Sequence, residues 1–200
     1  FLGTGQSLLQ MTFDRFLSSV PKENIFILTN EDYKSKVIDQ LKVDKGQVIC
    51  EPQRKNTAPC IAFATAKILN KDANATLVVT PADHLITNEK QFNSDLDIAI
   101  STAIEEDKLI TFGIKPHRPD TGYGYIEFND TDKSQQVQKV LQFREKPDLN
   151  KAEEFLNSGN FYWNSGMFIW RGSVLKCSFE KHCPELFNIF FANGDVYNKE

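Results

Sequence analysis

The sequence predicts an α/β fold, in which a mostly parallel sheet is flanked by helices and a mixed-strand lobe is inserted over the strand ends. Through the first 114 residues, short apolar runs alternate with stretches of helical periodicity. Beyond that point, strand-like runs follow one another with one short helix among them. With 40% hydrophobic and 25% charged residues, the composition is typical of an ordered globular chain.

Five elements are expected in the first third of the chain. Residues 6–19 carry leucine and phenylalanine at helical spacing after a glycine-rich start, which predicts the first helix. The run NIFILT at 24–29 predicts a strand, and the amphipathic stretch 31–41 a second helix. A second strand is expected at 47–50. The alanine-rich segment 57–69 predicts a helix, because its proline lies in the first turn, where proline is tolerated.

The central part of the chain contains the best candidate for a buried strand. This is the run ATLVVT at 75–80, which is β-branched and uncharged. A helix is expected at 91–106 and a strand at 109–114. Because α/β sheets bind ligands beyond the carboxyl ends of their strands, we expect function in the loop after residue 80.

The last third of the chain predicts the inserted lobe. Three strands are expected at 123–128, 137–145 and 161–170, with a short helix at 151–156 and a final helix at 175–191 that is interrupted near a proline. No repeat or flexible linker divides the chain. We therefore expect residues 1–200 to form a single domain.

Charge and composition exclude several classes of protein. The net charge of −4 leaves no basic excess for a nucleic acid partner. Apolar runs of a few residues are too short to span a membrane, and no charged-then-apolar leader is visible. The four cysteines form no C-x-x-C pair, which disfavours zinc and indicates a reduced, cytoplasmic protein.

Two polar segments follow expected strands in the first half. EPQRKNTAP at 51–59 leads into a helix, whose free N–H groups can cradle an anion or a nucleotide; alternatively, Asn56 or Thr57 caps that helix. PADHLI at 81–86 follows the buried strand, so Asp83 is placed to bind Mg²⁺ together with substrate phosphates. Alternatively, Asp83 caps the next turn.

Two further segments lie in the expected lobe. TGYGYIEF places Gly122 and Gly124 at the start of a strand, where glycine allows close backbone approach to a ligand or forms a bulge. FREKP ends a strand with Glu145 and Lys146. Since neighbouring residues on a strand point to opposite faces, a bend is needed to aim both at one ligand. The alternative is a solvated charge pair before a turn.

The fifth segment, FYWNSGMFIW, places Asn164, Ser165 and Gly166 inside an aromatic strand. Polar groups in such a place need hydrogen-bond partners. A sugar phosphate would provide them, and so would a bulge held together by its own side chains.

Taken together and in this order, the five segments resemble consecutive motifs of the mannose-1-phosphate guanylyltransferases, also called GDP-mannose pyrophosphorylases. The resemblance rests on EPQRKNTAP, PADH, TFGIKP, TGYGYI, FREKP and WNSGMF, and it runs from residue 1 to about residue 191. The combination of WNSGMF with RKNTAP separates this family from the thymidylyl- and uridylyltransferases of glucose 1-phosphate. The resemblance implies a Rossmann-like fold of the nucleotide-diphospho-sugar transferase type.

The resemblance implies transfer from GTP to mannose 1-phosphate, with GDP-mannose and pyrophosphate as products and Mg²⁺ as cofactor. Catalytic roles fall to Asp83, the metal ligand, and to Lys146, which would bind the sugar phosphate. The other implied contacts are Glu145 to mannose hydroxyls, Asn164 to the sugar phosphate, Gly122 and Gly124 against the sugar, and Asn56 and Thr57 near the nucleotide. Lys55 departs from the usual arginine and loses its bidentate fork.

Two family segments are not found in the sequence. Family members begin with a strand and a loop resembling GGxGTRLWPxSRxxPKQF, and a second metal-binding aspartate lies in a stretch resembling GWSDVGSW. We therefore expect a core fragment truncated at both ends, inactive alone, whose sheet has a gap or a substitute strand. Another sugar-1-phosphate nucleotidyltransferase, an added phosphomannose isomerase domain and a non-catalytic binding module stay open, as does a homo-oligomer.

We also expect Glu51 to bind the guanine base. A carboxylate only accepts hydrogen bonds and can take both N1–H and N2–H of guanine. The alternative is that Glu51 packs beside Pro52 or pairs with Arg54 or Lys55.

Overall fold

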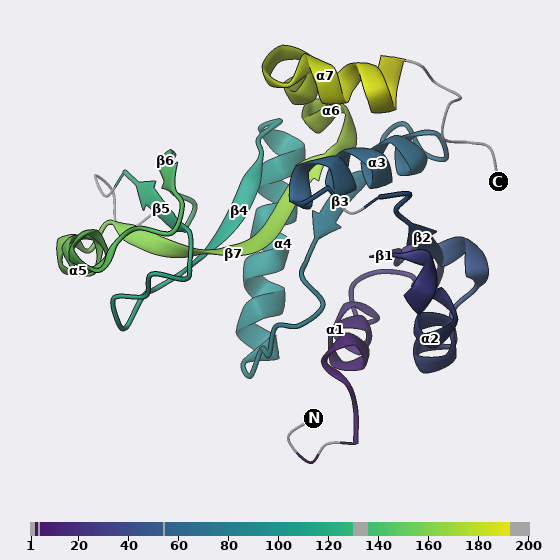
Figure 1. The fold of residues 1–200 in the computed structure, drawn as a ribbon, viewed down its shortest axis with the longest axis horizontal. Helices are drawn as coiled ribbons and strands as arrows, with labels where there is room; N and C mark the ends of the chain where they lie inside the picture. The colour runs from purple at the N-terminus through teal and green to yellow at the C-terminus, as the bar shows by residue number, and fades with distance from the viewer. Residues whose placement is uncertain (1–2, 4, 54, 130–135, 193–200) are drawn as a thin grey trace.

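Two sheets with helices around them make up the computed structural model, which describes residues 3, 5–53, 55–129 and 136–192 (Figure 1). The strands are β1 (Ile27–Thr29), β2 (Val48–Cys50), β3 (Thr76–Val79), β4 (Ile110–Ile114), β5 (Tyr125–Phe128), β6 (Val140–Arg144) and β7 (Phe161–Arg171). The α-helices are α1 (Leu8–Phe16), α2 (Glu31–Leu41), α3 (Thr57–Leu69), α4 (Glu89–Glu105), α5 (Leu149–Ser158), α6 (Gly172–His182) and α7 (Pro184–Phe187). Short 3₁₀ turns η1 (Lys22–Asn24) and η2 (Lys45–Gln47) and a π-helical turn η3 (Asn188–Ala192) complete them.

The larger sheet is organised around the long strand β7. Ile169 of β7 pairs with both β3 and β4, and Trp163 pairs with both β4 and β5. Because a strand has two edges, β3 and β5 follow one another along one edge of β7, and β4 runs along the other. β6 extends the sheet from β5.

Strand direction differs from the sequence-based expectation in one respect. The α/β class and the flanking helices are confirmed, and β1 and β2 pair in parallel. β3 and β4 run in the same direction, but β7 lies between them and pairs antiparallel to both. Every pairing described in the larger sheet is antiparallel, so this sheet is antiparallel rather than mostly parallel. Apolar periodicity marks a strand without giving its direction, which explains the difference.

The expected gap in the sheet is confirmed, because β1 and β3 lie in separate sheets among the described residues. Helix α1 connects the two halves through its apolar face. Phe13 packs in a cluster with Val37 and Val48 beside the smaller sheet. Phe16 packs with residues of α4 and with Ile169 of β7.

Helix ends follow their capping residues. Asn30 accepts a hydrogen bond from Tyr33 N–H and starts α2 where the sequence predicted it. Asn88 and Asp148 cap α4 and α5 in the same way. The expected final helix breaks at Cys183, because Pro184 cannot continue α6.

The inserted lobe has its own small core. Helix α5 packs on one face of β5 and β7, where Tyr125, Ala152 and Trp163 are buried. In Figure 1 this lobe, with α5, β5 and β6, lies at the end of the molecule opposite β1 and β2. Among the residues described, no helix is long and apolar enough to cross a membrane.

Candidate functional site

The candidate site lies along the edge of β7 that β3 and β5 share. Val79, the last residue of β3, pairs with Phe168, and Tyr125, the first residue of β5, pairs with Trp163. Residues 164–167 separate the two pairings. The loop after β3 and the loop before β5 therefore meet at this stretch of β7, and both carry sequence-predicted site residues.

The polar residues of this stretch form hydrogen bonds with one another and with β4. Asn164 Oδ1 accepts Gly166 N–H at 3.0 Å. Ser165 Oγ donates to Phe112 O at 2.8 Å and accepts Met167 N–H at 3.1 Å. The interpretation of a bulge held together by its own side chains is thus confirmed for Ser165. Because Asn164 uses its oxygen, its amide nitrogen keeps the role of donor.

Gly166 fixes the loop after β3 against β7. Its φ of 71° lies in the left-handed region, and a Cβ there would come within 3.3 Å of Pro81 Cγ. Glycine adopts this positive φ without strain and has no Cβ that would crowd Pro81. Pro81 opens the PADH loop, so this contact anchors the segment that contains Asp83.

Asp83 presents a carboxylate to solvent, with its side chain 81% exposed. Its Oδ1 lies 4.0 Å from Nε2 of His84. The helix that follows this loop, α4, is capped by Asn88 rather than by Asp83. Mg²⁺ takes one or two carboxylates and completes its shell with water and phosphate oxygens, which a single exposed Asp83 suits. The described residues hold no cluster of three acidic, histidine or cysteine ligands.

Gly124, Glu145 and Asn164 come together at the start of β5. Asn164 N–H donates to Gly124 O at 2.8 Å. A Cβ on Gly124 would lie 2.9 Å from Glu145 Oε2 and 3.6 Å from Asn164 Cβ. Glycine therefore lets the Glu145 carboxylate lie directly against the backbone, and close approach of a ligand to Gly124 stays a prediction.

The bend that FREKP required is present at Lys146. Its φ of 42° makes it one of four non-glycine residues with positive φ in the described part of the chain, together with Asn56. The bend brings Lys146 Nζ within 3.8 Å of Glu145 Oε1. Both side chains are mostly exposed, so a carboxylate and an ammonium are available side by side to a ligand.

Gly122 differs from Gly124. It is exposed, and its N–H already donates to Asp120 Oδ1 at 2.9 Å. This hydrogen bond shapes the loop, so the amide of Gly122 is occupied in the structure.

Glu51 extends the smaller sheet. Its N–H donates to Thr29 O at 2.8 Å, which continues the β1–β2 ladder by one residue. The pKa of the Cys60 thiol is raised to about 12, first by burial and then by the Glu51 carboxylate, whose charge opposes ionisation and which accepts a hydrogen bond from the thiol. Glu51 thus contacts α3 through Cys60. Arg54, one of its expected alternative partners, lies outside the described residues.

Asn56 and Thr57 begin α3 without the capping contact that was the alternative hypothesis. Asn56 has a φ of 67° and makes no side-chain hydrogen bond to the helix. Both residues are exposed. Helix α3 packs on the larger sheet through Ile61, which clusters with Leu77 and Trp170. Of the residues predicted to bind the nucleotide, Glu51 is thus held by the smaller sheet, whereas Asn56 and Thr57 start a helix that packs on the larger one.

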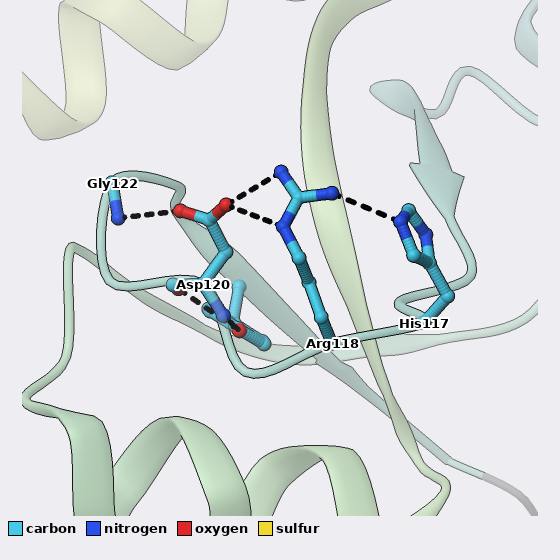
Figure 2. A network of polar contacts seen from close by, with 5 residues as sticks. His117, Arg118, Asp120 and Gly122 are labelled. Atoms are coloured by element: carbon cyan, nitrogen blue, oxygen red, sulfur yellow. Dashed lines mark hydrogen bonds and ion pairs between the residues drawn. The ribbon is translucent and has the colours of Figure 1, made fainter.

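One group of polar residues was missed by the sequence analysis. His117, Arg118 and Asp120 form a network beside Gly122 (Figure 2). The sequence feature that could have predicted this network is the segment HRPD, in which an arginine and an aspartate flank a proline directly before TGYG.

The model of a known family, nucleotidyl transferase, matches residues 1–196. The chain belongs to the nucleotidyl transferase family. Among its relatives, this family member is 40% identical over 168 residues to a mannose-1-phosphate guanylyltransferase of Salmonella montevideo, a match that covers 80% of the chain and 35% of the relative. It is 36% identical over 190 residues to the alginate biosynthesis protein AlgA of Pseudomonas syringae pv. tomato, covering 92% of the chain and 39% of the relative. The nucleotidyl transferase chain therefore spans well under half the length of these curated relatives.

Solved structures agree with this family assignment. A protein of Thermus thermophilus, described as a mannose-1-phosphate geranyltransferase, superposes with a TM-score of 0.86 at 26% identity, covering 97% of the chain and 56% of that protein. A protein of Helicobacter pylori, described as a mannose-6-phosphate isomerase, gives a TM-score of 0.79 at 34% identity, covering 92% of the chain and 68% of that protein. The fold is that of the nucleotide-diphospho-sugar transferases.

Proposed function

We propose that this chain belongs to an enzyme that transfers the GMP group of GTP to mannose 1-phosphate, giving GDP-mannose and pyrophosphate. The observation that carries the proposal is the contact between Gly124, Glu145 and Asn164, beside a loop that presents Asp83. The names of several relatives support the same sugar phosphate.

The reaction needs positioning more than acid–base catalysis. An oxygen of mannose 1-phosphate attacks the α-phosphorus of GTP in line, and the bond from that phosphorus to the bridging oxygen breaks. Pyrophosphate leaves with the bonding electrons. Since a sugar phosphate is already ionised, no general base is required.

On the sugar side, Glu145 accepts hydrogen bonds from mannose hydroxyls while Lys146 and the amide of Asn164 bind the phosphate. The 3.8 Å between the charged ends of Glu145 and Lys146 suits a ligand that has hydroxyls and a phosphate close together. Gly124 lets the Glu145 carboxylate lie against the backbone, which sets the position from which it would bind the sugar. For Gly122 we retain a role in the shape of this loop rather than a direct contact, because its N–H is bonded to Asp120.

Asp83 is the residue that would hold Mg²⁺. When bound there, the ion would neutralise negative charge that develops on the phosphates. The exposed carboxylate leaves room for phosphate oxygens and water.

On the nucleotide side, Glu51 binds guanine, and Asn56 and Thr57 lie beside the nucleotide at the start of α3. The first N–H groups of α3, without a side-chain cap from Asn56, are donors for phosphate. We further place the protein in the cytoplasm, since its four cysteines are free thiols.

The test is to assay the full-length protein for pyrophosphate and nucleotide-sugar formation. We expect turnover with GTP and mannose 1-phosphate in the presence of Mg²⁺, and much less with UTP, dTTP or glucose 1-phosphate. Preference for another pair would assign a different sugar-1-phosphate nucleotidyltransferase. Binding of the sugar nucleotide without turnover of any pair would assign a non-catalytic module. Isomerisation of mannose 6-phosphate is assayed in parallel, because that activity is named for the protein of Helicobacter pylori.

A further inference from the structure

The loop before β5 contains an ion pair between Arg118 and Asp120, and the Asp120 carboxylate also binds a backbone N–H of the same loop. Arg118 donates to Oδ2 of Asp120 through Nε at 3.1 Å and through Nη2 at 2.7 Å. The other oxygen, Oδ1, accepts the N–H of Gly122 at 2.9 Å. Figure 2 shows the guanidinium of Arg118 between Asp120 and His117, with Gly122 on the far side of the carboxylate. The Asp120 side chain thus links Arg118 to the Gly122 backbone.

The backbone of Asp120 is fixed by a buried tyrosine. Asp120 N–H donates to the hydroxyl of Tyr125 at 3.0 Å, and the same hydroxyl donates to Asp120 O at 3.0 Å. Tyr125 is fully buried and is the first residue of β5. The turn between Asp120 and Tyr125 is therefore closed at its two ends by one rigid side chain.

Arg118 is held in place by more than its ion pair. Its guanidinium lies 5.3 Å from the ring of Trp163, and Nη1 donates to Nε2 of His117 at 2.9 Å. The rings of His117 and Tyr123 each lie 5.1 Å from Trp163. Trp163 is buried on β7, immediately before Asn164. The loop therefore folds around the residue that precedes a sugar-side amide.

The position of this network indicates that it does more than stabilise the fold, because it is bonded to the turn that leads to Gly124. Exposed ion pairs contribute little to folding, and the Arg118 side chain is half exposed. The Asp120 carboxylate, by contrast, is 22% exposed and is bonded to the backbone of the turn that ends in Gly124. Gly124 is the residue that lies against Glu145 and Asn164.

We infer that Arg118 and Asp120 are positioning residues of the sugar-phosphate subsite: they hold the Gly122–Gly124 turn in its binding shape before the substrate arrives. The inference rests on the proposed function, because it takes Gly124, Glu145 and Asn164 as the sugar side. Preorganisation of this kind lowers the cost of ordering a loop on binding. Loss of the pair should therefore weaken binding of mannose 1-phosphate and leave GTP binding unchanged.

Two substitutions of Asp120 separate the contacts it makes. Asp120→Asn keeps an acceptor for Gly122 N–H but removes the negative charge opposite Arg118. Asp120→Ala removes both. Glu154→Gln, which alters an exposed ion pair with Lys151 on α5, is the matched control. Steady-state kinetics of the full-length protein give the KM for each substrate separately.

We expect Asp120→Ala to raise the KM for mannose 1-phosphate about tenfold, because the carboxylate that holds the turn in place before binding is lost. Asp120→Asn should raise it less, and Glu154→Gln should match the wild type. The KM for GTP should be unchanged in all three. Equal rises in both KM values, or no change in Asp120→Ala, would overturn the inference. Thermal unfolding shows whether each variant folds. If Asp120→Ala does not fold, the KM of Asp120→Asn for mannose 1-phosphate tests the inference instead.

Hydrogen exchange of the Gly122 amide distinguishes this inference from the proposed function. In the wild type without substrate, we expect slow exchange at Gly122, and faster exchange in Asp120→Ala. If the wild type transfers no nucleotide to mannose 1-phosphate, the proposed function fails while slow exchange still supports a preformed turn. If Gly122 exchanges as fast in the wild type as in the variant, the turn is not preformed and the inference fails even for an active enzyme.

Discussion

The two halves of the proposed site differ in how far they are assembled without substrate. On the sugar side, Gly124, Glu145 and Asn164 are in contact, and a hydrogen bond joins Gly124 to Asn164 of β7. On the nucleotide side, Asn56 and Thr57 are exposed at the start of α3, and Glu51 contacts Cys60. The residues proposed for the sugar are therefore already in contact with one another, whereas those proposed for the nucleotide are separate groups.

The difference follows from where each half is built. The sugar side uses loops that meet on a single long strand, so each loop is packed against a rigid neighbour. The nucleotide side uses the end of β2 and the start of α3, which belong to different halves of the fold. Substitutions on the sugar side should therefore change one substrate's binding, and those on the nucleotide side the other's.

The largest effect is expected at Asp83, the proposed ligand of Mg²⁺. Asp83→Asn in the full-length enzyme should lower kcat about a hundredfold or more, because an amide is a poorer and uncharged ligand for Mg²⁺. The fold should be intact, since the carboxylate is exposed. The measurement is kcat at saturating substrates across a Mg²⁺ titration. Asp97→Asn, on the exposed side of α4, is the control. Near-normal kcat at limiting Mg²⁺ would remove Asp83 from the site.

The second largest effect is expected in the choice of base. Leaving a buried donor of guanine unpaired costs about 1–3 kcal/mol, or roughly ten- to a hundredfold in affinity. Glu51→Gln should therefore lose most of the preference for GTP over ITP, which lacks the 2-amino group. The ratio of the two kcat/KM values is the measurement, with the exposed Glu23→Gln as control. An unchanged ratio would assign guanine to another group.

A smaller effect, confined to the sugar side, is expected at Lys146. Lys146→Ala should raise the KM for mannose 1-phosphate about tenfold, because a charge-assisted contact to phosphate made in the ground state is lost. The KM for GTP should not change, in contrast to Glu51→Gln. Lys151→Ala on α5 removes an exposed lysine of similar surroundings and serves as the control. A normal KM for mannose 1-phosphate would exclude Lys146 from the subsite.

The smallest effect concerns the acidity of Asp120. Its pKa is lowered from 3.8, first by the hydrogen bond from Gly122 N–H and then by the hydrogen bond and charge of Arg118. A lowered carboxyl pKa stabilises the folded state above the unfolded value of about 3.8, and this stability is lost as the pH falls through the folded pKa. The turn should therefore stay closed at neutral and mildly acidic pH. NMR titration of the carboxyl carbon should give a midpoint below 3.8 that rises in Arg118→Ala. A midpoint that is the same in both proteins would show that Arg118 has no influence on the carboxyl.

Local features of the fold were predictable from the sequence. The bounds of α2 and α3 match the expected ranges 31–41 and 57–69, because Asn30 caps α2 and the proline of α3 lies in its first turn, where proline is tolerated. The sequence also singled out Gly124, Glu145 and Asn164, and the structure brings these three residues into contact.

Features that depend on tertiary pairing were not predictable in the same way. The direction of β7 follows from which strands it joins, and apolar periodicity is the same in either direction. The partners of Asp120 come from Tyr125 and from a loop folded around Trp163, a residue far along the chain. The contact between Glu51 and Cys60 likewise needs β2 and α3 to be packed together.

The central place of β7 has a consequence for how the chain is synthesised. Its partners β3, β4 and β5 all precede it in the sequence, so none of these pairings can form until residues 161–171 have left the ribosome. At a synthesis rate of about 5–20 residues per second, β3 waits on the order of 5–20 s for this partner. During that time the apolar run TLVV has an unpaired edge towards β7, which is the kind of segment that aggregates. The strand that joins the core to the inserted lobe therefore also delays formation of the larger sheet until late in synthesis.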